Sequence, residues 1–210
     1  MTPELPRLHA VTSSQILTLP DLGDRARAIG HSPDVALHVR SRDLPGRALT
    51  RLAARLGEAT ERAGAWVFVN DRADVALLAG VRGVHLPADG LPTDRVRDLV
   101  GPDVWIGRST HTPEEARRAT DAGADYVFLG PIWETPSHPG RPGLGPGIIE
   151  DAQPARVVAI GGVTPGRIAS CRDAGAFGVA AIAALWHAED PGSAATTMLL
   201  LLGSSRNSGE

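Results

Sequence analysis

The chain of 210 residues is 42% hydrophobic and 21% charged, a balance typical of a globular protein with a sizeable core. All 21 of its basic residues are arginines, which excludes enzymes that depend on a lysine amine, such as Schiff-base aldolases, pyridoxal enzymes and P-loop NTPases. A net charge of −3 and an aromatic content of 4% argue against a nucleic-acid partner.

The cysteine content and the apolar runs indicate where the protein works. A single cysteine, Cys171, permits no internal disulfide and suits a reducing compartment. The N-terminal residues contain no apolar signal-peptide core, and no apolar run approaches the roughly 18 residues that a membrane-spanning helix needs. We therefore expect a cytoplasmic protein that does not bind membranes.

An Ala-Gly phrase that recurs along the chain marks places where a helix ends and a strand begins. A glycine after the last helical turn can adopt the left-handed conformation that closes the turn, and the β-branched or aromatic residues that follow favour a strand. The four copies occupy residues 63–67, 79–84, 122–127 and 174–179. Four such junctions predict an alternating α/β fold.

The remaining apolar runs complete a set of eight expected strands, near 8–11, 35–39, 65–69, 83–86, 104–107, 126–129, 157–160 and 179–182. Helical patterns separate them, among them 46–63, 71–79, 113–122, 164–174 and 191–202.

Eight strands that alternate with helices predict a single (β/α)8 TIM barrel, close to the minimum length of about 200 residues for that fold. We expect one domain over residues 1–203 and a frayed polar tail over 204–210. A doubly wound open sheet is the alternative. It is disfavoured because no Gly-x-Gly-x-x-Gly follows the first strand and no acidic residue is placed to bind a ribose.

Barrel active sites form at the carboxyl ends of the strands, and four of the seven histidines fall there. His38, His85, His111 and His138 gathered on one rim indicate proton transfer near neutral pH. Any single one of them could instead cap a strand end. No spacing typical of a transition-metal site is present.

Two groups of residues on the same rim favour a phosphorylated small molecule. Arg40 and Arg42 follow the second strand two residues apart, so they point the same way, and guanidinium forks suit phosphate. Surface salt bridges are the alternative for this pair. Loops seven and eight form the common phosphate site of barrels. Their candidate residues here are Gly161, Gly162, Ile182 and Ala183.

Two carboxylates and one long loop complete the candidates. Asp71, with Asp89, could hold Mg²⁺ on a phosphate, although Asn70 and Asp71 could equally cap the following helix. The Pro- and Gly-rich stretch 130–145 follows the sixth strand. It is expected to be a loop, either against the substrate or as a plain connection.

Several of these segments together resemble the thiamine phosphate synthase/TenI superfamily over nearly the whole chain. The segments are Val69-Asn70-Asp71, Gly83-Val84-His85-Leu86, Ile106-Gly107-Arg108-Ser109-Thr110-His111, Leu129-Gly130-Pro131-Ile132 and Ala159-Ile160-Gly161-Gly162-Val163-Thr164. The resemblance implies a (β/α)8 barrel and a role in assembling the thiazole half of thiamine phosphate.

The superfamily has two branches, and the departures from its patterns favour one of them. Synthases have Gln-x-Arg-x-Lys after strand two, His-Leu-Gly-Gln after strand four and Thr-x-Thr-Lys in loop six. Here the matching places read His38-Val39-Arg40-Ser41-Arg42, His85-Leu86-Pro87-Ala88 and Thr135-Pro136-Ser137-His138. The absence of lysine explains only the lysine positions, and the other changes resemble the TenI-type branch. Asn70-Asp71 is retained as in synthases.

The resemblance therefore leads us to expect a thiazole tautomerase, an isomerase that aromatises a carboxythiazole ethyl phosphate without a cofactor. His111 matches the catalytic histidine of that branch, as general base and acid, and Arg40 and Arg42 would hold the substrate carboxylate. Phosphate would bind at Gly161, Gly162, Ile182 and Ala183. Further substrate contacts are expected at His38, Asn70, His85, Ser109, Thr135, Ser137 and His138.

Two alternatives remain open. The first is thiamine phosphate synthase, a transferase that joins thiazole phosphate to hydroxymethylpyrimidine diphosphate, releases diphosphate and needs Mg²⁺, with Asp71 and Asp89 as ligands. The second is a non-catalytic regulatory protein that binds thiazole phosphate. In every case the expected partner is a small phosphorylated thiazole, and a homo-oligomer is compatible with the sequence.

Overall fold

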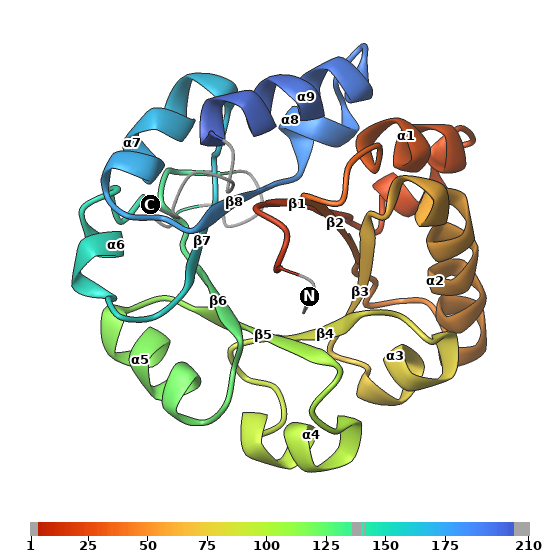
Figure 1. Ribbon diagram of the computed structural model, residues 1–210, viewed down its shortest axis with the longest axis horizontal. Coiled ribbons are helices and arrows are strands. Elements are labelled where there is room, and N and C mark those ends of the chain that lie inside the picture. The colour runs from red at the N-terminus through yellow and green to blue at the C-terminus, as the bar shows by residue number, and fades with distance from the viewer. Residues whose placement is uncertain (1–3, 136–139, 141, 204–210) are drawn as a thin grey trace.

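The computed structural model describes residues 4–135, 140 and 142–203, and in them eight parallel strands form one closed barrel (Figure 1). The strands are β1 Leu8–Val11, β2 Val35–Val39, β3 Trp66–Asn70, β4 Gly83–Leu86, β5 Trp105–Thr110, β6 Tyr126–Leu129, β7 Val157–Ile160 and β8 Gly178–Ala181. Each strand pairs with the next in the chain, and β1 closes the ring against β8. The predicted (β/α)8 barrel is confirmed.

Helices cover the outside of this ring (Figure 1). They are α1 Leu22–Ile29, α2 Gly46–Thr60, α3 Ala73–Ala79, α4 Thr93–Val100, α5 Pro113–Asp121, α6 Ile148–Asp151, α7 Ile168–Asp173, α8 Ala183–Trp186 and α9 Pro191–Leu202, with short 3-10 turns at Ile16–Thr18, Glu61–Ala63 and Pro165–Arg167. The expected tail 204–210 lies outside the described residues.

Local signals explain where several helices begin and end. Thr112 caps α5 by accepting a hydrogen bond from the Glu115 backbone N–H at 3.2 Å, and Pro113 occupies the first turn, where it costs no hydrogen bond. Gly80 closes α3 with a φ of 64°. This is the left-handed helix end that the repeated Ala-Gly phrase predicts.

The end of one strand and the start of one helix differ from the expectation. The fifth strand was expected to end at Gly107, but β5 continues to Thr110, because Arg108, Ser109 and Thr110 keep their parallel pairing with β6. Helix α3 begins at Ala73 rather than near Asp71, because Asp71 has a φ of 67° and cannot belong to a right-handed helix.

Side chains alternate along each strand and divide the core into two layers. Outward side chains such as Leu37 and Val69 pack under the helices in the larger layer. Inward side chains fill the barrel, where Phe68, Tyr126 and Phe128 form an aromatic centre. Leu5, just before β1, belongs to this inner cluster at the amino-terminal end of the barrel.

Small residues make room for the large inward rings. A Cβ on Gly83 would lie 2.3 Å from the Phe68 ring, and one on Gly107 would lie 2.2 Å from the Tyr126 ring. The barrel interior is therefore a packed core rather than a channel, and any ligand must bind at its rim.

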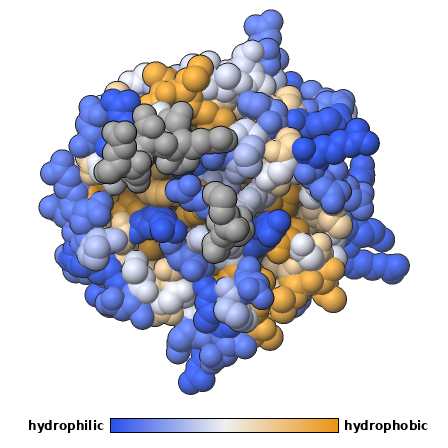
Figure 2. Space-filling view, viewed as in Figure 1, coloured by the Kyte–Doolittle hydropathy of each residue, from blue (hydrophilic) through white to orange (hydrophobic). Residues whose placement is uncertain are grey.

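Polar and charged side chains cover much of the surface in Figure 2, with apolar patches between them. Within the described part of the chain, none of the helices has the length and apolar character needed to cross a membrane.

Candidate functional site

The carboxyl ends of β2, β3, β4 and β5 are consecutive in the ring, so the polar residues that end them form one continuous arc. The arc contains Arg40, Arg42, Asn70, Asp71, Asp89 and Ser109, with His111 just beyond the end of β5. We call this set the β2–β5 arc. All seven residues were predicted from the sequence, and the topology places the ends of their strands side by side.

Arg40 and Arg42 bring two positive charges to the start of the arc. The Arg40 backbone N–H donates to Thr12 Oγ1 at 2.9 Å, and this bond fixes the chain as it leaves β2. Burial lowers the pKa of the Arg40 guanidinium, and repulsion from Arg42 lowers it further. Among the described residues neither arginine forms a salt bridge, so the alternative of a surface ion-paired couple does not hold.

Asp71 has the only positive φ of any non-glycine residue in the described chain, at 67°. Its N–H donates to the His85 carbonyl at 2.8 Å, and the Arg72 N–H reaches back across it to the Asn70 carbonyl at 2.8 Å. This is a γ-turn of the rare strained kind, which costs about 1–3 kcal/mol. No side chain caps α3, so the capping role considered for Asn70 and Asp71 is not what the structure shows.

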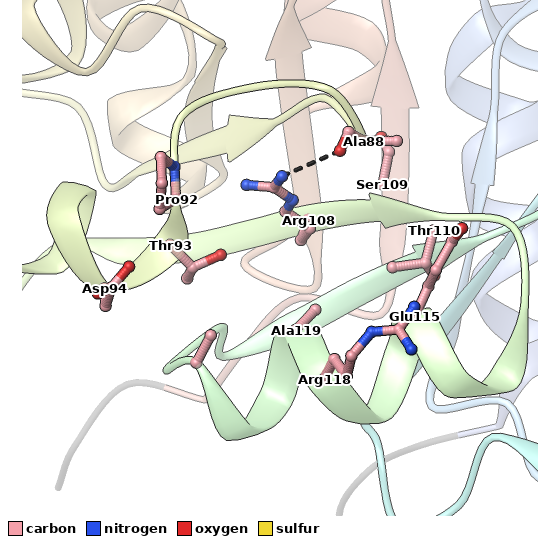
Figure 3. A pocket seen from close by; sticks show the side chains of 11 residues that line it. Ala88, Pro92, Thr93, Asp94, Arg108, Ser109, Thr110, Glu115, Arg118 and Ala119 are labelled. Atoms are coloured by element: carbon pink, nitrogen blue, oxygen red, sulfur yellow. Dashed lines mark hydrogen bonds between the residues drawn. The ribbon is translucent and has the colours of Figure 1, made fainter.

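Asp89 lies in the loop after β4, and Arg108 holds that loop in place. The Arg108 guanidinium leaves β5 and donates to the Ala88 carbonyl at 3.0 Å (Figure 3). It also donates to the carbonyls of Gly90 at 3.3 Å and Leu91 at 2.5 Å. Asp89 is exposed between two of these anchored residues. Arg108 therefore orders the carboxylate loop instead of facing a ligand.

Asp71 and Asp89 are the carboxylates that the sequence analysis assigned to a magnesium ion shared with a phosphorylated substrate. Mg²⁺ sites of this kind use one or two carboxylates and fill the remaining positions with phosphate oxygens and water. Asp71 and Asp89 are both exposed, and they follow neighbouring strands. No group of three or more His, Cys, Asp or Glu side chains able to hold a metal alone occurs in the described residues.

His111 is fixed on the rim by its ring and by its backbone. Its Nδ1 donates to the Gly130 carbonyl at 2.6 Å, which requires the proton to be on Nδ1. Its backbone N–H donates to Glu115 Oε2 at 2.7 Å, so the carboxylate at the start of α5 orients the turn. His111 therefore joins the end of β5 to the start of loop six.

His38 and His85 were expected to contact substrate, but both lie beneath the rim, with 0% and 1% of their surface exposed. His38 Nε2 bonds with His9 Nδ1 at 2.9 Å, and His85 bonds with Tyr126 and Ser109. Burial lowers the pKa of both rings well below its ordinary value, aided by repulsion from neighbouring charges. We therefore revise their roles from substrate contact to support of the residues above them.

His9 is a member of this interior network that the sequence analysis did not select. Its Nε2 donates to the Pro6 carbonyl at 2.9 Å, and burial lowers its pKa to about 3. The available signal was a histidine in an otherwise apolar strand, at a position whose side chain points into the barrel.

A second group of predicted site residues, expected to bind phosphate, lies at the ends of β7 and β8. Gly161 and Gly162 have φ values of 97° and 66°, and a Cβ on either would collide with loop six. Ile182 and Ala183 follow the neighbouring strand β8. We call these four residues the β7–β8 glycine site.

Arg167 braces this site and was not selected from the sequence. Its Nη1 donates to the Gly162 carbonyl at 2.6 Å, and its guanidinium stacks 5.0 Å from the Trp133 ring centroid. Arginine in the turn after a glycine pair was the only signal that could have indicated it.

The base of loop six is fixed against β7. The Ile132 N–H donates to the Ile160 carbonyl at 2.8 Å, and the Trp133 N–H donates to the Gly161 carbonyl at 3.1 Å. Thr135 is half-buried at the end of this anchored stretch. The expected contacts at Ser137 and His138 lie outside the described residues.

Two cavities of about 400 Å³ lie outside the barrel interior, and the first of them reaches the rim at Ala88 and Ser109. One is lined by Thr93, Arg108, Thr110 and Ala119 between β5 and the helices α4 and α5 (Figure 3). The other lies at the amino-terminal side, against α9. Barrel chemistry takes place at the carboxyl ends of the strands, so the β2–β5 arc and the β7–β8 glycine site form the candidate active site.

A family model described as thiamine monophosphate synthase matches residues 8–185. The chain belongs to this family. It is 46% identical to the bifunctional ThiM/ThiE protein of Symbiobacterium thermophilum over 78% of the present chain. It is 40% identical to the thiamine-phosphate synthase of Gloeobacter violaceus over 89% of the present chain. It spans 35% and 54% of those two relatives.

Other relatives match along most of both chains. The thiamine-phosphate synthase of Thermus thermophilus is 36% identical, over 82% of this chain and 84% of the relative. Thiamine phosphate pyrophosphorylase from Pyrococcus furiosus superposes with a TM-score of 0.78 at 26% identity, covering 93% of this chain and 95% of that one. A 3-hexulose-6-phosphate synthase at 16% identity shares the fold, with a TM-score of 0.70.

These comparisons contradict the expected isomerase. Relatives at 36–46% identity are named thiamine-phosphate synthases, so the tautomerase interpretation is wrong. The structure supplies the physical reason. His38, which counted against a synthase, is a buried ring paired with His9. The general-base role of His111 belonged to the rejected reaction and is withdrawn with it.

Proposed function

We propose that the protein is a thiamine phosphate synthase, a transferase that joins thiazole phosphate to hydroxymethylpyrimidine diphosphate and releases diphosphate. The observation that supports the proposal is that two separate groups of residues suited to anions, the β2–β5 arc and the β7–β8 glycine site, lie at the carboxyl ends of strands of one barrel. A tautomerase has one phosphorylated substrate, whereas the synthase must hold a diphosphate and a phosphate together.

The β2–β5 arc suits the diphosphate. Arg40 and Arg42 repel each other in the free protein, and an anion between them relieves that repulsion. Guanidinium forks also match phosphate oxygens in a bidentate geometry. The arginines would stabilise the charge that builds on the diphosphate as its bond to the pyrimidine breaks, which is the electrostatic contribution expected of such a site.

Asp71 and Asp89 would hold Mg²⁺ at the same arc. When bound, the ion neutralises phosphate charge and stabilises the departing diphosphate. The γ-turn at Asp71 and the Arg108 bonds to the Asp89 loop fix the backbone on both sides. The backbone that carries the two carboxylates is thus fixed before the substrate arrives.

The β7–β8 glycine site suits the phosphate of the thiazole. The absence of side chains at Gly161 and Gly162 lets a ligand approach the backbone closely. Arg167 fixes the Gly162 peptide through its carbonyl, so the site is ordered without ligand. The two substrates would then meet above the packed barrel interior.

A direct assay tests this function. Purified protein with both substrates and Mg²⁺ should release diphosphate and form thiamine phosphate, and omission of either substrate should abolish the product. Arg55→Ala, which alters an exposed residue of α2, is a suitable control for variants of the arc. Binding of thiazole phosphate without turnover would instead support the non-catalytic alternative.

A further inference from the structure

A column of three hydrogen-bonded side chains leads from the barrel interior to the β2–β5 arc. Tyr126 Oη lies 3.2 Å from His85 Nδ1, and His85 Nε2 lies 2.9 Å from Ser109 Oγ. Tyr126 and His85 are buried, with 0% and 1% exposure, whereas Ser109 is half-buried at the end of β5. A contact at the rim is thus connected to a phenol at the barrel centre.

A glycine makes this column possible. A Cβ on Gly107 would lie 2.4 Å from the Tyr126 hydroxyl and 2.5 Å from His85 Nδ1. Any side chain at residue 107 would therefore occupy the place where the phenol meets the imidazole. Gly107 pairs directly with His85 in the β4–β5 register and with Tyr126 in the β5–β6 register, so all three lie at one level of the barrel.

The hydrogen-bond inventory fixes the direction of the protons. A neutral imidazole has one donor and one acceptor nitrogen, and His85 is taken as neutral because a charged ring would be costly at 1% exposure against Tyr126 and Phe128. Among the described residues the Tyr126 hydroxyl has no partner other than His85. If His85 Nδ1 carried the proton, the buried Tyr126 hydrogen would lack an acceptor, at a cost of about 1–3 kcal/mol.

The satisfied arrangement therefore runs in one direction. Tyr126 donates to His85 Nδ1, and His85 Nε2 donates to Ser109 Oγ. The Ser109 oxygen is occupied as an acceptor, and no described residue accepts its hydroxyl hydrogen. Ser109 is thus left to act toward a ligand as a donor, which is what an anionic oxygen requires.

We propose that Tyr126 and His85 are positioning residues that hold the Ser109 hydroxyl as a hydrogen-bond donor to a diphosphate oxygen. The assignment of the ligand rests on the proposed synthase function, because Ser109 lies on the strand next to the Asp89 loop. Ser109 and Thr110 leave β5 on opposite sides, so only Ser109 shares the inward face with Gly107 (Figure 3).

Tyr126→Phe removes only the hydroxyl at the base of the column. With the phenol gone, neither tautomer of His85 is favoured by that contact, and Ser109 spends part of its time donating to His85 instead of to a ligand. We expect about a threefold to tenfold loss of affinity for inorganic diphosphate with Mg²⁺, measured by calorimetry, and about tenfold for Ser109→Ala. The KM for the pyrimidine diphosphate should rise while the KM for thiazole phosphate is unchanged.

Thr110→Val is the matched control. The Thr110 hydroxyl is also buried and also makes one hydrogen bond, to the Phe128 carbonyl at 3.0 Å, but it points out of the barrel. Its loss should lower the melting temperature as much as Tyr126→Phe does without weakening diphosphate binding.

The double variant separates positioning from general destabilisation. If Tyr126 acts through Ser109, adding Tyr126→Phe to Ser109→Ala should cost no further affinity. If Tyr126→Phe lowers the affinity for diphosphate equally with and without the Ser109 hydroxyl, the proposal is overturned. Gly107→Ala, which crowds the phenol, should reproduce the Tyr126→Phe effect if the variant folds, and Tyr126→Phe alone decides the matter if it does not.

Proton–nitrogen NMR correlation spectra test the column without any substrate. His85 should carry its proton on Nε2 in the unaltered protein and show a mixture of tautomers in Tyr126→Phe. A proton on Nδ1 in the unaltered protein would refute the arrangement. If the unaltered protein neither binds diphosphate nor shows synthase turnover, both the assigned ligand and the proposed function are refuted. If turnover is normal but the affinity losses of Tyr126→Phe and Ser109→Ala add up in the double variant, only the role of the column is refuted.

Discussion

His38 donates a hydrogen bond from Nε2 to His9 Nδ1 at 2.9 Å, inside a barrel where both rings are fully buried. The direction follows from the other side of His9, where Nε2 must donate to the Pro6 carbonyl. Burial keeps both rings neutral, and the two bonds then give each ring one defined tautomer. Protonation of either one would place an uncompensated charge among Phe68, Phe128 and Tyr126.

This arrangement predicts that the fold loses stability in acid. Burial lowers the pKa of His9 to about 3, and the pKa values of His38 and His85 also fall below the ordinary 6.5. The unfolded chain then binds more protons than the folded one below pH 6.5, so the histidine contribution to stability is complete above that pH and is lost as pH falls toward 3. Each buried histidine contributes a slope of up to about 1.4 kcal/mol per pH unit.

Urea unfolding at pH 7.5, 6 and 5 measures that slope. Replacing His187, which is exposed, by Gln should leave it unchanged. Replacing His9 by Phe should reduce it, whatever the effect on stability at pH 7.5. A free energy of unfolding that is the same at pH 7.5 and pH 5 would contradict the prediction.

The arginine pair should act on one substrate only. Arg40→Ala or Arg42→Ala should raise the KM for the pyrimidine diphosphate at least about tenfold, because a charge-assisted contact to phosphate is worth about 1.5–3 kcal/mol. The KM for thiazole phosphate should change little. Steady-state kinetics with each substrate varied in turn measures both, and equal effects on the two would remove the pair from the diphosphate region.

The metal prediction concerns Asp71. Asn tolerates a left-handed φ, so Asp71→Asn should keep the γ-turn while removing the charge. We expect turnover to fall at least about tenfold and to respond less to added Mg²⁺. Asp74→Asn is the control, because Asp74 is an exposed carboxylate paired with Arg72. Turnover that survives chelation in the unaltered protein would show that the carboxylates serve another purpose.

Local sequence patterns predict the helices and strands, whereas the burial of a side chain depends on contacts between strands that are distant in the sequence. Eight strands followed from the Ala-Gly junctions and apolar runs, because helix ends and strand starts are set by neighbouring residues. The extension of β5 through Ser109 was missed, since its polar residues resemble a loop and only pairing with β6 keeps them in the strand. Burial at His38 was missed as well, because its hydrogen-bond acceptor, His9 Nδ1, lies in another strand.

The same limitation explains the wrong choice of branch. The change from glutamine to histidine at residue 38 was interpreted as a change of substrate contact, yet it belongs to a pair of rings in the core. A single sequence displays both histidines but not their contact. The rim residues Arg40, Asp71 and Gly162 were chosen correctly as members of the rim, since residues that follow strands in a parallel barrel must lie there.

The phosphate prediction concerns Gly162, whose φ of 66° and close neighbours leave no room for a side chain. A Cβ there would lie 2.8 Å from Trp133 Cβ and 3.0 Å from the Glu134 carbonyl oxygen, so Gly162→Ala must move loop six or the glycine site itself. The KM for thiazole phosphate should rise at least about tenfold, with a smaller effect on the pyrimidine diphosphate.

Gly166→Ala provides the matched control in the same turn. Its added Cβ meets nothing within 4 Å, and its φ is not left-handed, so this variant should keep normal kinetics. Calorimetric binding of thiazole phosphate distinguishes a lost contact from a misfolded loop, because a folded Gly162→Ala with unchanged affinity would show that phosphate binds elsewhere on the rim. Weakened binding in both variants would instead point to the turn as a whole, and the close approach of the ligand to Gly162 would lose its support.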